Sequence, residues 1–472
     1  MSGKSSITEG GTFFALLRFA LPLMAVNLLQ VFYTSADMMI VGLSGVGDAV
    51  GAIGTTLPMI NLIVNAFMGM SVGANVVLAG AIGAHDGEKA EKVLHTSLVF
   101  SVIIGILAAL IGMAVSRPVL SVMGNRGELM NLSVKYSVIY FAGVPALSVT
   151  NFSAAMLRAS GDSKSPLCII GISGLFNVLF NLLFVLAFGM SVDGVALATV
   201  LANILSAILL IVRLAKRKTP YALRFSKLRL NKKALFSIVH IGVPAGLQSI
   251  LFSVSHLLIQ SSVLTVNNSI AGADAAYQPV VKGCSAATNL ETFANTAVNA
   301  VTQAAITFIG QNAGAGNYKR CRRVRRSAYG LGFCTATLSA MLLLLLHKPL
   351  LALYGVTPGE DGTLERIAYE SAAARMMIMM APYFLLAFME TGSAIMQALS
   401  RPLTATAVSV CGSVLFRVLW IIFVFDAVPT LTVIFISYPI SWLLTGTVHF
   451  IFGQREIKAL EKKQAQQSSC LQ

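Results

Sequence analysis

Long runs of apolar residues, separated by short polar segments, cover almost the whole chain. A helix that crosses a membrane needs about 20 predominantly apolar residues, and Gly, Pro and charged residues mark the ends of such runs. This pattern predicts an all-α, polytopic membrane protein with twelve transmembrane helices. They are expected over residues 13–42, 52–82, 93–115, 131–158, 166–188, 194–213, 234–264, 276–311, 328–353, 367–398, 403–425 and 430–453.

The amino-acid composition excludes a soluble protein. Of the 472 residues, 56% are hydrophobic and 11% are charged, whereas a soluble domain is about 25% charged. A soluble protein of this length could not cover its surface with so few polar residues. The six cysteines have no spacing typical of a metal site. We therefore expect no cofactor other than a coupling ion.

Lys and Arg are distributed unevenly between alternate connections. With both termini in the cytoplasm, most of the 34 basic residues lie in inner segments, and the outer segments contain Arg117, Arg126, Lys348 and Arg366. Because cytoplasmic loops are enriched in Lys and Arg, this pattern predicts a multi-pass protein of the inner (plasma) membrane with both termini cytoplasmic. The net charge of +15 comes from basic residues in the predicted cytoplasmic loops. It therefore does not indicate binding to nucleic acid, and we expect no nucleic-acid partner.

The two halves of the chain share a pattern. Residues 17–22 (LRFALP) recur in outline as 239–244 (VHIGVP), and Pro145 corresponds to Pro382. Six helices per half is an even number, so both halves have the same orientation in the membrane. We predict two pseudo-symmetric six-helix lobes, with domains 1–212 (N-lobe), 213–233 (basic cytoplasmic linker), 234–454 (C-lobe) and 455–472 (cytoplasmic tail).

Polar residues inside the predicted helices of the first half are candidate functional residues, because a charge in the hydrocarbon costs about 2.5–3.5 kcal/mol. Asp37 shares one helical face with Gln30 and Thr34, and Tyr33 flanks that face. Two asparagines on the fifth helix and a threonine on the sixth could complete a site with Asp37: Asn177, Asn181 and Thr199. One carboxylate with several neutral oxygens suits a small monovalent cation, or a proton on the carboxylate alone. The alternative is that these polar groups only join helices.

The second half has its own polar residues within helices. Glu291 and Asn295 lie on one face of the eighth helix, and Glu390 lies among methionines on the tenth. Methionine side chains are flexible and occur on promiscuous binding surfaces, so this part of the chain could bind bulky organic cations. Packing against neighbouring helices or lipid is the alternative.

Enzyme motifs are missing from the sequence, which has no H-E-x-x-H, no G-x-S-x-G and no complete phosphate loop. No polar segment is long enough to form a soluble catalytic domain. The sequence therefore predicts a transporter and not an enzyme.

Gly69 and Gly73, four residues apart, are typical of close helix packing.

Several segments resemble the multidrug and toxic compound extrusion (MATE) transporters. Residues 22–30 (PLMAVNLLQ), followed by Tyr33 and Asp37, resemble the first helix of that family. Further similar segments are 158–166 (RASGDSKSP), 194–199 (GVALAT) and 310–317 (GQNAGAGN). The resemblance is greatest to the prokaryotic branch related to DNA-damage-inducible members. It implies two lobes around a V-shaped cavity and export of drugs in exchange for inward Na⁺ or H⁺.

The resemblance also implies roles for individual residues. Asp37 corresponds to the acid of the family's N-lobe cation site, and Asn177 and Thr199 correspond to its partners. These three would ligate the metal if the coupling ion is Na⁺. Asn181 stands where some members have a second aspartate, which leaves a single charge and favours H⁺. Glu390 resembles an acid that other branches use on the tenth helix.

Our hypothesis from the sequence is a monomeric secondary active antiporter that works by alternating access. It would export amphiphilic, cationic drugs or toxic organic compounds in exchange for H⁺ or Na⁺. The expected substrate-binding residues are Gln30, Tyr33, Thr34, Glu291, Asn295 and Glu390. The alternatives are a flippase for lipid-linked saccharides or lipids and, more remotely, an intramembrane enzyme.

Overall fold

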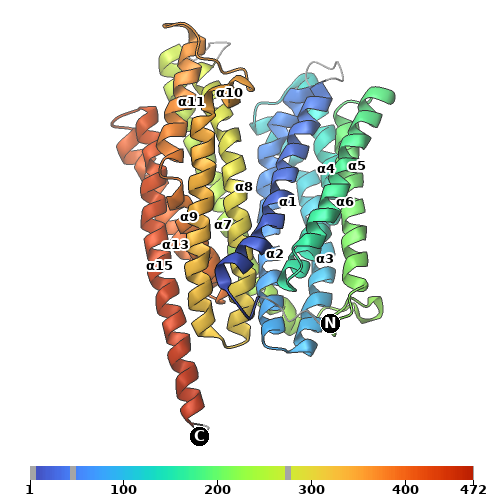
Figure 1. The fold of residues 1–472 in the computed structure, drawn as a ribbon. Helices are drawn as coiled ribbons and strands as arrows, with labels where there is room; N and C mark the ends of the chain where they lie inside the picture. Colours follow the sequence, from blue (N-terminus) through green and yellow to red (C-terminus); the bar gives the residue numbers. More distant parts are fainter. Residues whose placement is uncertain (1–6, 43–48, 272–277, 471–472) are drawn as a thin grey trace. The chain divides into compact units, whose positions relative to one another are not determined.

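The computed structural model describes residues 7–42, 49–271 and 278–470, and every regular element within them is helical. The first half of the chain forms α1 (Thr12–Gly42), α2 (Ala49–Gly83), α3 (Gly87–Val122), α4 (Gly127–Ala159), α5 (Lys164–Leu182, continued by a π-helix over Leu183–Ala187) and α6 (Val192–Ala215). The second half forms α7 (Lys232–Ala271), α8 (Pro279–Gly314), α9 (Tyr318–Leu345), α10 (His347–Ala352), α11 (Leu364–Met380), α12 (Phe384–Ala398), α13 (Pro402–Ser409), α14 (Phe416–Trp420) and α15 (Leu431–Cys470), with π-helices over Val410–Leu415 and Ile421–Phe425. Figure 1 shows these helices in sequence colours.

Most of these helices could cross a membrane. In the described part of the chain, ten spans are long and apolar enough, and α11 with α12 makes an eleventh as a bent pair. The remaining predicted span is α8, whose 36 residues would extend about 54 Å at 1.5 Å per residue, more than the thickness of a hydrocarbon core. Because α8 contains many polar residues, it is less apolar than the other spans and is not among the ten. The predicted fold class, an all-α polytopic membrane protein, is confirmed.

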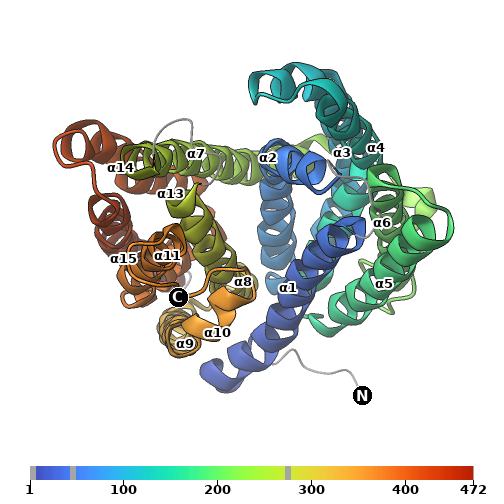
Figure 2. The same cartoon turned by 90° about the horizontal axis from the view of Figure 1, so that it is seen from above.

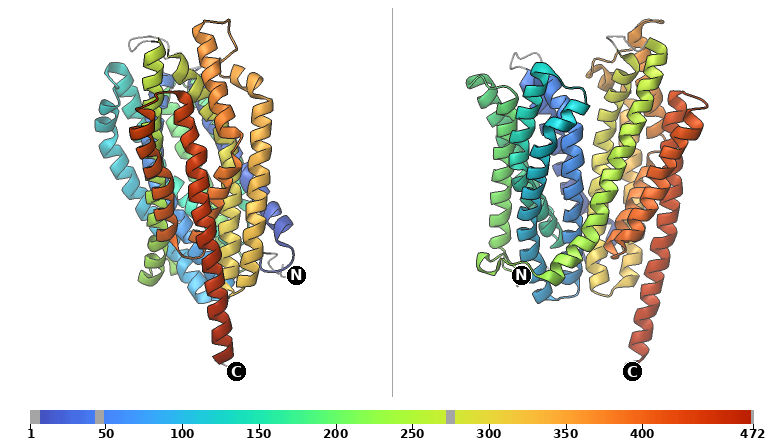
Figure 3. Two further views of the ribbon diagram at one scale, coloured as in Figure 1. Left: turned by 90° about the vertical axis from the view of Figure 1, so that its left-hand side faces the viewer. Right: turned by 180° about the vertical axis from the view of Figure 1, so that it is seen from behind.

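Most observed helices are longer than predicted, for example α3, which was expected over 93–115, and three predicted helices differ in a further way. The predicted helix 367–398 is two helices bent by 52° at residues 381–383, because Pro382 removes a backbone donor and clashes with the preceding turn. The predicted helix 328–353 is likewise divided, at Leu346. The last helix was predicted to end at 453, but α15 continues to Cys470 and extends past the other helices of its half (Figure 3).

The chain divides into two compact units. Unit 1 contains Met1–Gly10, Arg18–Ile250 and Gly310–Asn317, and unit 2 contains Gly11–Leu17, Leu251–Ile309 and Tyr318–Gln472. These bounds differ from the predicted domains chiefly because the first part of α7 belongs to unit 1. In Figure 2 the helices of each unit can be followed from above.

Helices α3, α4 and α6 pack side by side in unit 1. Small residues allow close contacts there, and a side chain at Gly112 would overlap the ring of the buried Phe141. The first part of α7 packs against α2 in the same way: a Cβ on Gly69 would lie 2.5 Å from the backbone nitrogen of Gly246, and one on Gly73 would overlap the backbone of α7. The predicted packing role of Gly69 and Gly73 is therefore confirmed.

The core of unit 2 is formed by buried residues of α7, α8, α9, α11, α12 and α15. Most of the methionines of α11 and α12 that the sequence singled out are buried in unit 2: Met376, Met379, Met380, Met389 and Met396. Met377 is 63% exposed. Glu461 in the extended end of α15 pairs with Arg322 of α9, and Glu456 pairs with Arg401 at 2.8 Å. The extension of α15 is thus held to its own unit by ion pairs.

Candidate functional site

Four of the predicted residues meet in unit 1. Asn181 of α5 donates from Nδ2 to Oδ1 of Asp37 on α1 at 2.5 Å, and Thr199 of α6 donates from its hydroxyl to Oδ2 at 3.4 Å. Asn177 Nδ2 donates to the Thr199 hydroxyl at 3.3 Å, and Nδ2 of Asn181 also reaches Asn177 Oδ1 at 3.4 Å. The structure therefore brings Asp37, Asn177, Asn181 and Thr199 into one hydrogen-bonded group, which we call the Asp37 cluster.

The local sequence explains this geometry. Asn177 and Asn181 are four residues apart and lie on one face of α5, and both are buried, with Asn181 fully inaccessible. The single Thr199 hydroxyl proton is shared between Asp37 Oδ2 at 3.4 Å and Val195 O at 3.0 Å, and the second contact fixes the hydroxyl along α6. No ion pair among the described residues involves Asp37, so its carboxylate is held by neutral donors.

One atom of the cluster has no partner. Asn181 Oδ1 is buried and accepts no hydrogen bond, although buried polar atoms are nearly always satisfied. A carboxylate oxygen of Asp37, the Thr199 hydroxyl and this free carbonyl oxygen are hard donors of the kind that alkali cations prefer. The cluster therefore fits either a small cation or a proton on Asp37.

The remaining residues predicted on α1 have different surroundings. The Tyr33 hydroxyl donates to Gly171 O at 3.0 Å, and its ring lies where a side chain on Gly174 would be. Tyr33 thus holds α1 against α5. Gln30 and Thr34 are exposed, and the Thr34 hydroxyl donates to Gln30 O at 3.0 Å within the helix.

Sequence reasoning missed two tyrosines near Asp37. Tyr136 and Tyr140 of α4 have ring centroids 6.0 Å apart, and both lie close enough to Asp37 to interact with its charge. Their i, i+4 spacing on a membrane helix was the signal that could have revealed them.

In unit 2, Glu291 lies within an ion pair. Arg375 of α11 donates from Nε and Nη2 to the two carboxylate oxygens at 2.8 and 2.9 Å, and both side chains are at most 10% exposed. The Arg375 guanidinium also lies over the Phe435 ring at 5.0 Å. Asn295 is exposed and lies beside the Tyr383 hydroxyl. The sequence prediction did not include Arg375, because its partner is 84 residues away.

Glu390 has a different environment from Glu291. It is half-buried, and no Lys, Arg or His of the described residues lies within ion-pair distance of it. The charge of Arg417 acts on Glu390, and Arg417 is 2% exposed, donates to Ser441 Oγ at 3.0 Å and stacks over Tyr438 at 4.1 Å. Tyr438 also hydrogen-bonds to His256 at 3.2 Å. Arg417 and His256 are polar residues within helices that the sequence prediction did not select.

Apolar helices that enclose paired and solitary charges define a helical membrane transporter. The profile of the family described as MatE matches residues 22–183 and 244–422, and the chain belongs to this family. The predicted resemblance is thereby confirmed. The protein is a multi-pass membrane transporter and not an enzyme.

Curated relatives match over most of the chain. The probable multidrug resistance protein YoeA of Bacillus subtilis is 27% identical, with 94% of each chain covered. The FAD transporter of Shewanella oneidensis is 24% identical over 93% of this chain and 94% of its own. The probable multidrug resistance protein NorM of Thermotoga maritima is 24% identical over 73% of this chain and 72% of its own.

Solved structures share the fold. A MOP superfamily transporter from Pyrococcus furiosus has a TM-score of 0.87 at 20% identity, covering 98% of this chain and 99% of that one. A multidrug resistance MATE family transporter in an outward-facing conformation has a TM-score of 0.85 at 20% identity with the same coverage. At this identity the likeness concerns the fold alone.

Proposed function

We propose that this protein is a secondary active antiporter that exports amphiphilic organic cations across the plasma membrane in exchange for inward H⁺. The observation that supports it most is the Asp37 cluster, in which one carboxylate is held by neutral side chains from two other helices. Two of the relatives described above are named as multidrug resistance proteins. Both termini would lie in the cytoplasm, and the protein would work as a monomer without a cofactor or a nucleic-acid partner.

The cluster suggests how a proton would drive the cycle. Ionised Asp37 accepts hydrogen bonds from Asn181 and Thr199, which tie α1 to α5 and α6. A protonated carboxyl is a poorer acceptor on the oxygen that binds the proton, so loading a proton loosens one of these ties. α1 would then favour a different arrangement, and the protein would shift between inward-open and outward-open states. With Na⁺ as the coupling ion, Asp37, Asn177 and Thr199 would hold the metal.

Glu390 is the strongest candidate for substrate recognition in unit 2. It is a half-buried acid that forms no ion pair with any described residue, whereas Glu291 already binds Arg375. An organic cation could compete with Arg417 for the Glu390 carboxylate. The side chains of Gln30 and Thr34 on α1 are exposed and can contact substrate. Asn295 on α8 is exposed as well.

A second candidate function is export of an anionic compound of the flavin dinucleotide kind. Its support is the similarity to the FAD transporter over nearly the whole chain, together with two of the buried arginines of unit 2, Arg375 and Arg417. A lipid flippase remains the alternative of the same superfamily.

Transport by purified protein in liposomes tests these proposals. Uphill export of a cationic dye is measured under a pH gradient and, separately, under a Na⁺ gradient, with FAD as the competing substrate. Asp37→Asn should abolish uphill export under the pH gradient but preserve substrate exchange, while the control Asp426→Asn, at an exposed acid, should behave as wild type. Accumulation by Asp37→Asn, or a wild type that works only with Na⁺, would contradict proton coupling.

A further inference from the structure

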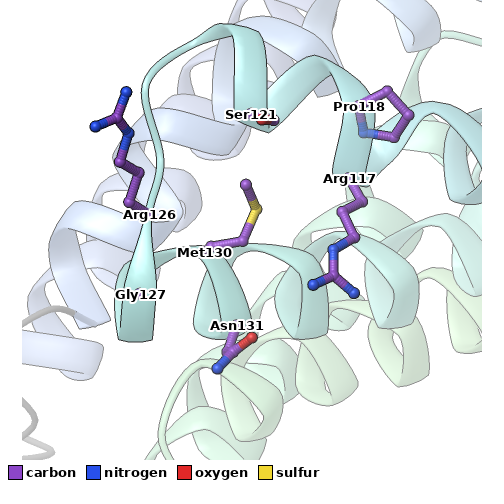
Figure 4. A pocket seen from close by; sticks show the side chains of 7 residues that line it. All are labelled: Arg117, Pro118, Ser121, Arg126, Gly127, Met130 and Asn131. Carbon is purple, nitrogen blue, oxygen red and sulfur yellow. The ribbon is translucent and has the colours of Figure 1, made fainter.

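A cavity of about 690 Å³ lies between the end of α3 and the start of α4. It is lined by Arg117, Pro118, Ser121, Arg126, Gly127, Met130 and Asn131. Figure 4 shows Arg117 and Arg126 on opposite sides of the cavity with Met130 between them; the Arg117 guanidinium points toward Asn131, and that of Arg126 points outward, so a shared ligand requires Arg126 to change rotamer. Two of the four basic residues of the predicted outer segments therefore line one cavity.

Neither guanidinium is neutralised. Arg117 and Arg126 are exposed, and no ion pair of the described residues involves either of them. Lys135 of α4 and the outer residue Arg366 provide a contrast, since Lys135 binds Asp193 at 2.9 Å and Arg366 binds Glu370 at 2.6 Å. Glu128 follows in the first turn of α4 but does not line the cavity. The cavity thus has a positive lining without a counter-charge.

The connection that holds Arg126 is fixed in place. Asn125 is 2% exposed and donates from Nδ2 to the hydroxyls of Thr55 and Ser133 at 3.1 and 2.9 Å. It thereby ties the connection to both α2 and α4. Arg126 is the N-cap residue of α4. Its backbone is extended, and its side chain makes no capping hydrogen bond to the helix. The backbone N–H groups of that first turn add partial positive charge near the cavity.

The cavity lies at the depth of lipid headgroups. Between Lys92 and Arg117 the 24 residues of α3 contain no Asp, Glu, Lys or Arg. This run extends about 36 Å, slightly more than a hydrocarbon core of about 30 Å. Arg117 therefore reaches the interface. Immediately before it, α3 exposes apolar side chains along which an acyl chain can lie, including Leu107, Leu110 and Ile111.

We propose that this cavity binds the phosphate of an anionic amphiphile, with Arg117 and Arg126 as the cationic ligands and Asn131 and Ser121 as neutral donors. Arginine is well suited to phosphate because its guanidinium can donate two parallel hydrogen bonds. Pro118 and Met130 contribute the apolar part of the lining. The phosphate belongs to a membrane lipid headgroup or to a soluble phosphate ester, and the chemistry is the same for both sources.

Lipid binding to the full-length protein tests this site. Native mass spectrometry measures retention of phosphatidylglycerol and phosphatidylcholine by wild type, by the double variant Arg117→Gln/Arg126→Gln and by the control Lys348→Gln, which removes another exposed outer cation. Each surface cation contributes about 1 kcal/mol to binding anionic lipid, so the double variant should bind phosphatidylglycerol at least tenfold more weakly. The control should bind as wild type does, and Arg117→Lys/Arg126→Lys should recover part of the loss.

A second measurement distinguishes the sources. Thermal unfolding in lipid-free detergent is followed with glycerol 1-phosphate as the soluble probe. Glycerol 1-phosphate could stabilise wild type but not the Gln double variant, while neither protein retains phosphatidylglycerol selectively. That result would assign the site to a soluble phosphate. Loss of phosphatidylglycerol in the Gln double variant alone would assign it to a lipid. Equal behaviour of wild type and the Gln double variant toward both probes would overturn the proposal.

Discussion

At the scale of single residues, the contrast between Asp37, Glu291 and Glu390 is the most informative feature. All three are acids within membrane helices, yet their neighbours differ. Asp37 accepts hydrogen bonds from an amide and a hydroxyl, Glu291 binds a guanidinium through both oxygens, and Glu390 pairs with no charged side chain in the described part of the chain. On the proposed function we expect an ion-binding role for Asp37 and a substrate-binding role for Glu390, whereas the ion pair of Glu291 favours a structural role.

Asn181 determines how many charges the Asp37 cluster contains. In Asn181→Asp, two carboxylates would lie within hydrogen-bond distance, and both can be ionised only with a cation between them. We expect Na⁺, but not an equal concentration of K⁺, to stabilise the variant, by about 2.7 kcal/mol at one hundred times its dissociation constant. Thermal unfolding in detergent measures the effect. A wild type stabilised by Na⁺ to the same extent would show that one carboxylate is sufficient.

Removing half of the Glu291–Arg375 pair should destabilise the protein. Glu291→Gln leaves a buried guanidinium without its counter-charge, which typically costs about 3–5 kcal/mol. The double variant Glu291→Gln/Arg375→Met removes both charges and should recover much of that loss. Denaturation of both variants, combined with dye transport, separates stability from substrate recognition. A Glu291→Gln protein of wild-type stability that no longer transports would instead place Glu291 in the substrate site.

At the scale of elements, short connections hold the helices of unit 1 together. Asp162, between α4 and α5, accepts from the Ser165 backbone and hydroxyl at 2.9 and 2.7 Å and from Arg213 of α6 at 3.1 Å. Burial acts to raise the pKa of Asp162, but these hydrogen bonds and the nearby Arg217 together hold it below its ordinary value. The Asp162 carboxylate therefore connects the end of α4 with the start of α5 and with α6.

This lowered pKa predicts an acid-dependent loss of stability. Because the pKa of Asp162 is lower in the folded state than in the unfolded chain, where it is about 3.9, its ionised form stabilises the protein above that pH. The contribution is lost as the pH falls through the folded-state value. Asp162→Asn should cost about 1–2 kcal/mol at pH 7 and progressively less below pH 4. Melting temperatures from pH 7 to pH 3 measure this, and a constant difference would exclude ionisation as the cause.

The contact between α2 and the first part of α7 depends on the absence of side chains. Gly69→Ala would place a methyl group against the backbone of Gly246, and overpacking of this kind costs about 1–3 kcal/mol. Gly54→Ala on the same helix meets no atom within 4 Å and should be neutral or slightly stabilising. Denaturation of the two variants side by side checks the prediction. Equal stability would mean that α7 can move away from α2 without cost.

At the scale of the whole molecule, the sequence predicts the order and class of the helices because apolar runs determine membrane spans. It does not predict where a helix bends. Pro22, Pro58 and Pro145 lie inside continuous helices, whereas Pro382 interrupts one, and only the surrounding packing distinguishes them. The Asp37 cluster was predictable from i, i+4 spacing and from resemblance. The partner of Glu291 was not, because ion pairing between distant helices leaves no local pattern.

The polarity of α8 has a consequence for how the chain is made. A charged residue near the centre of a helix opposes insertion by about 2.5–3.5 kcal/mol, and α8 contains Glu291 together with several amides. Arg375, which neutralises that charge, is synthesised 84 residues later. The ribosome must therefore deliver α8 to the translocon before its counter-charge exists. We expect α8 alone, in a glycosylation-reporter fusion, to insert poorly compared with α3, and Glu291→Leu to improve it. If α8 inserts as efficiently as α3 on its own, its partition into the bilayer does not depend on helices that follow it.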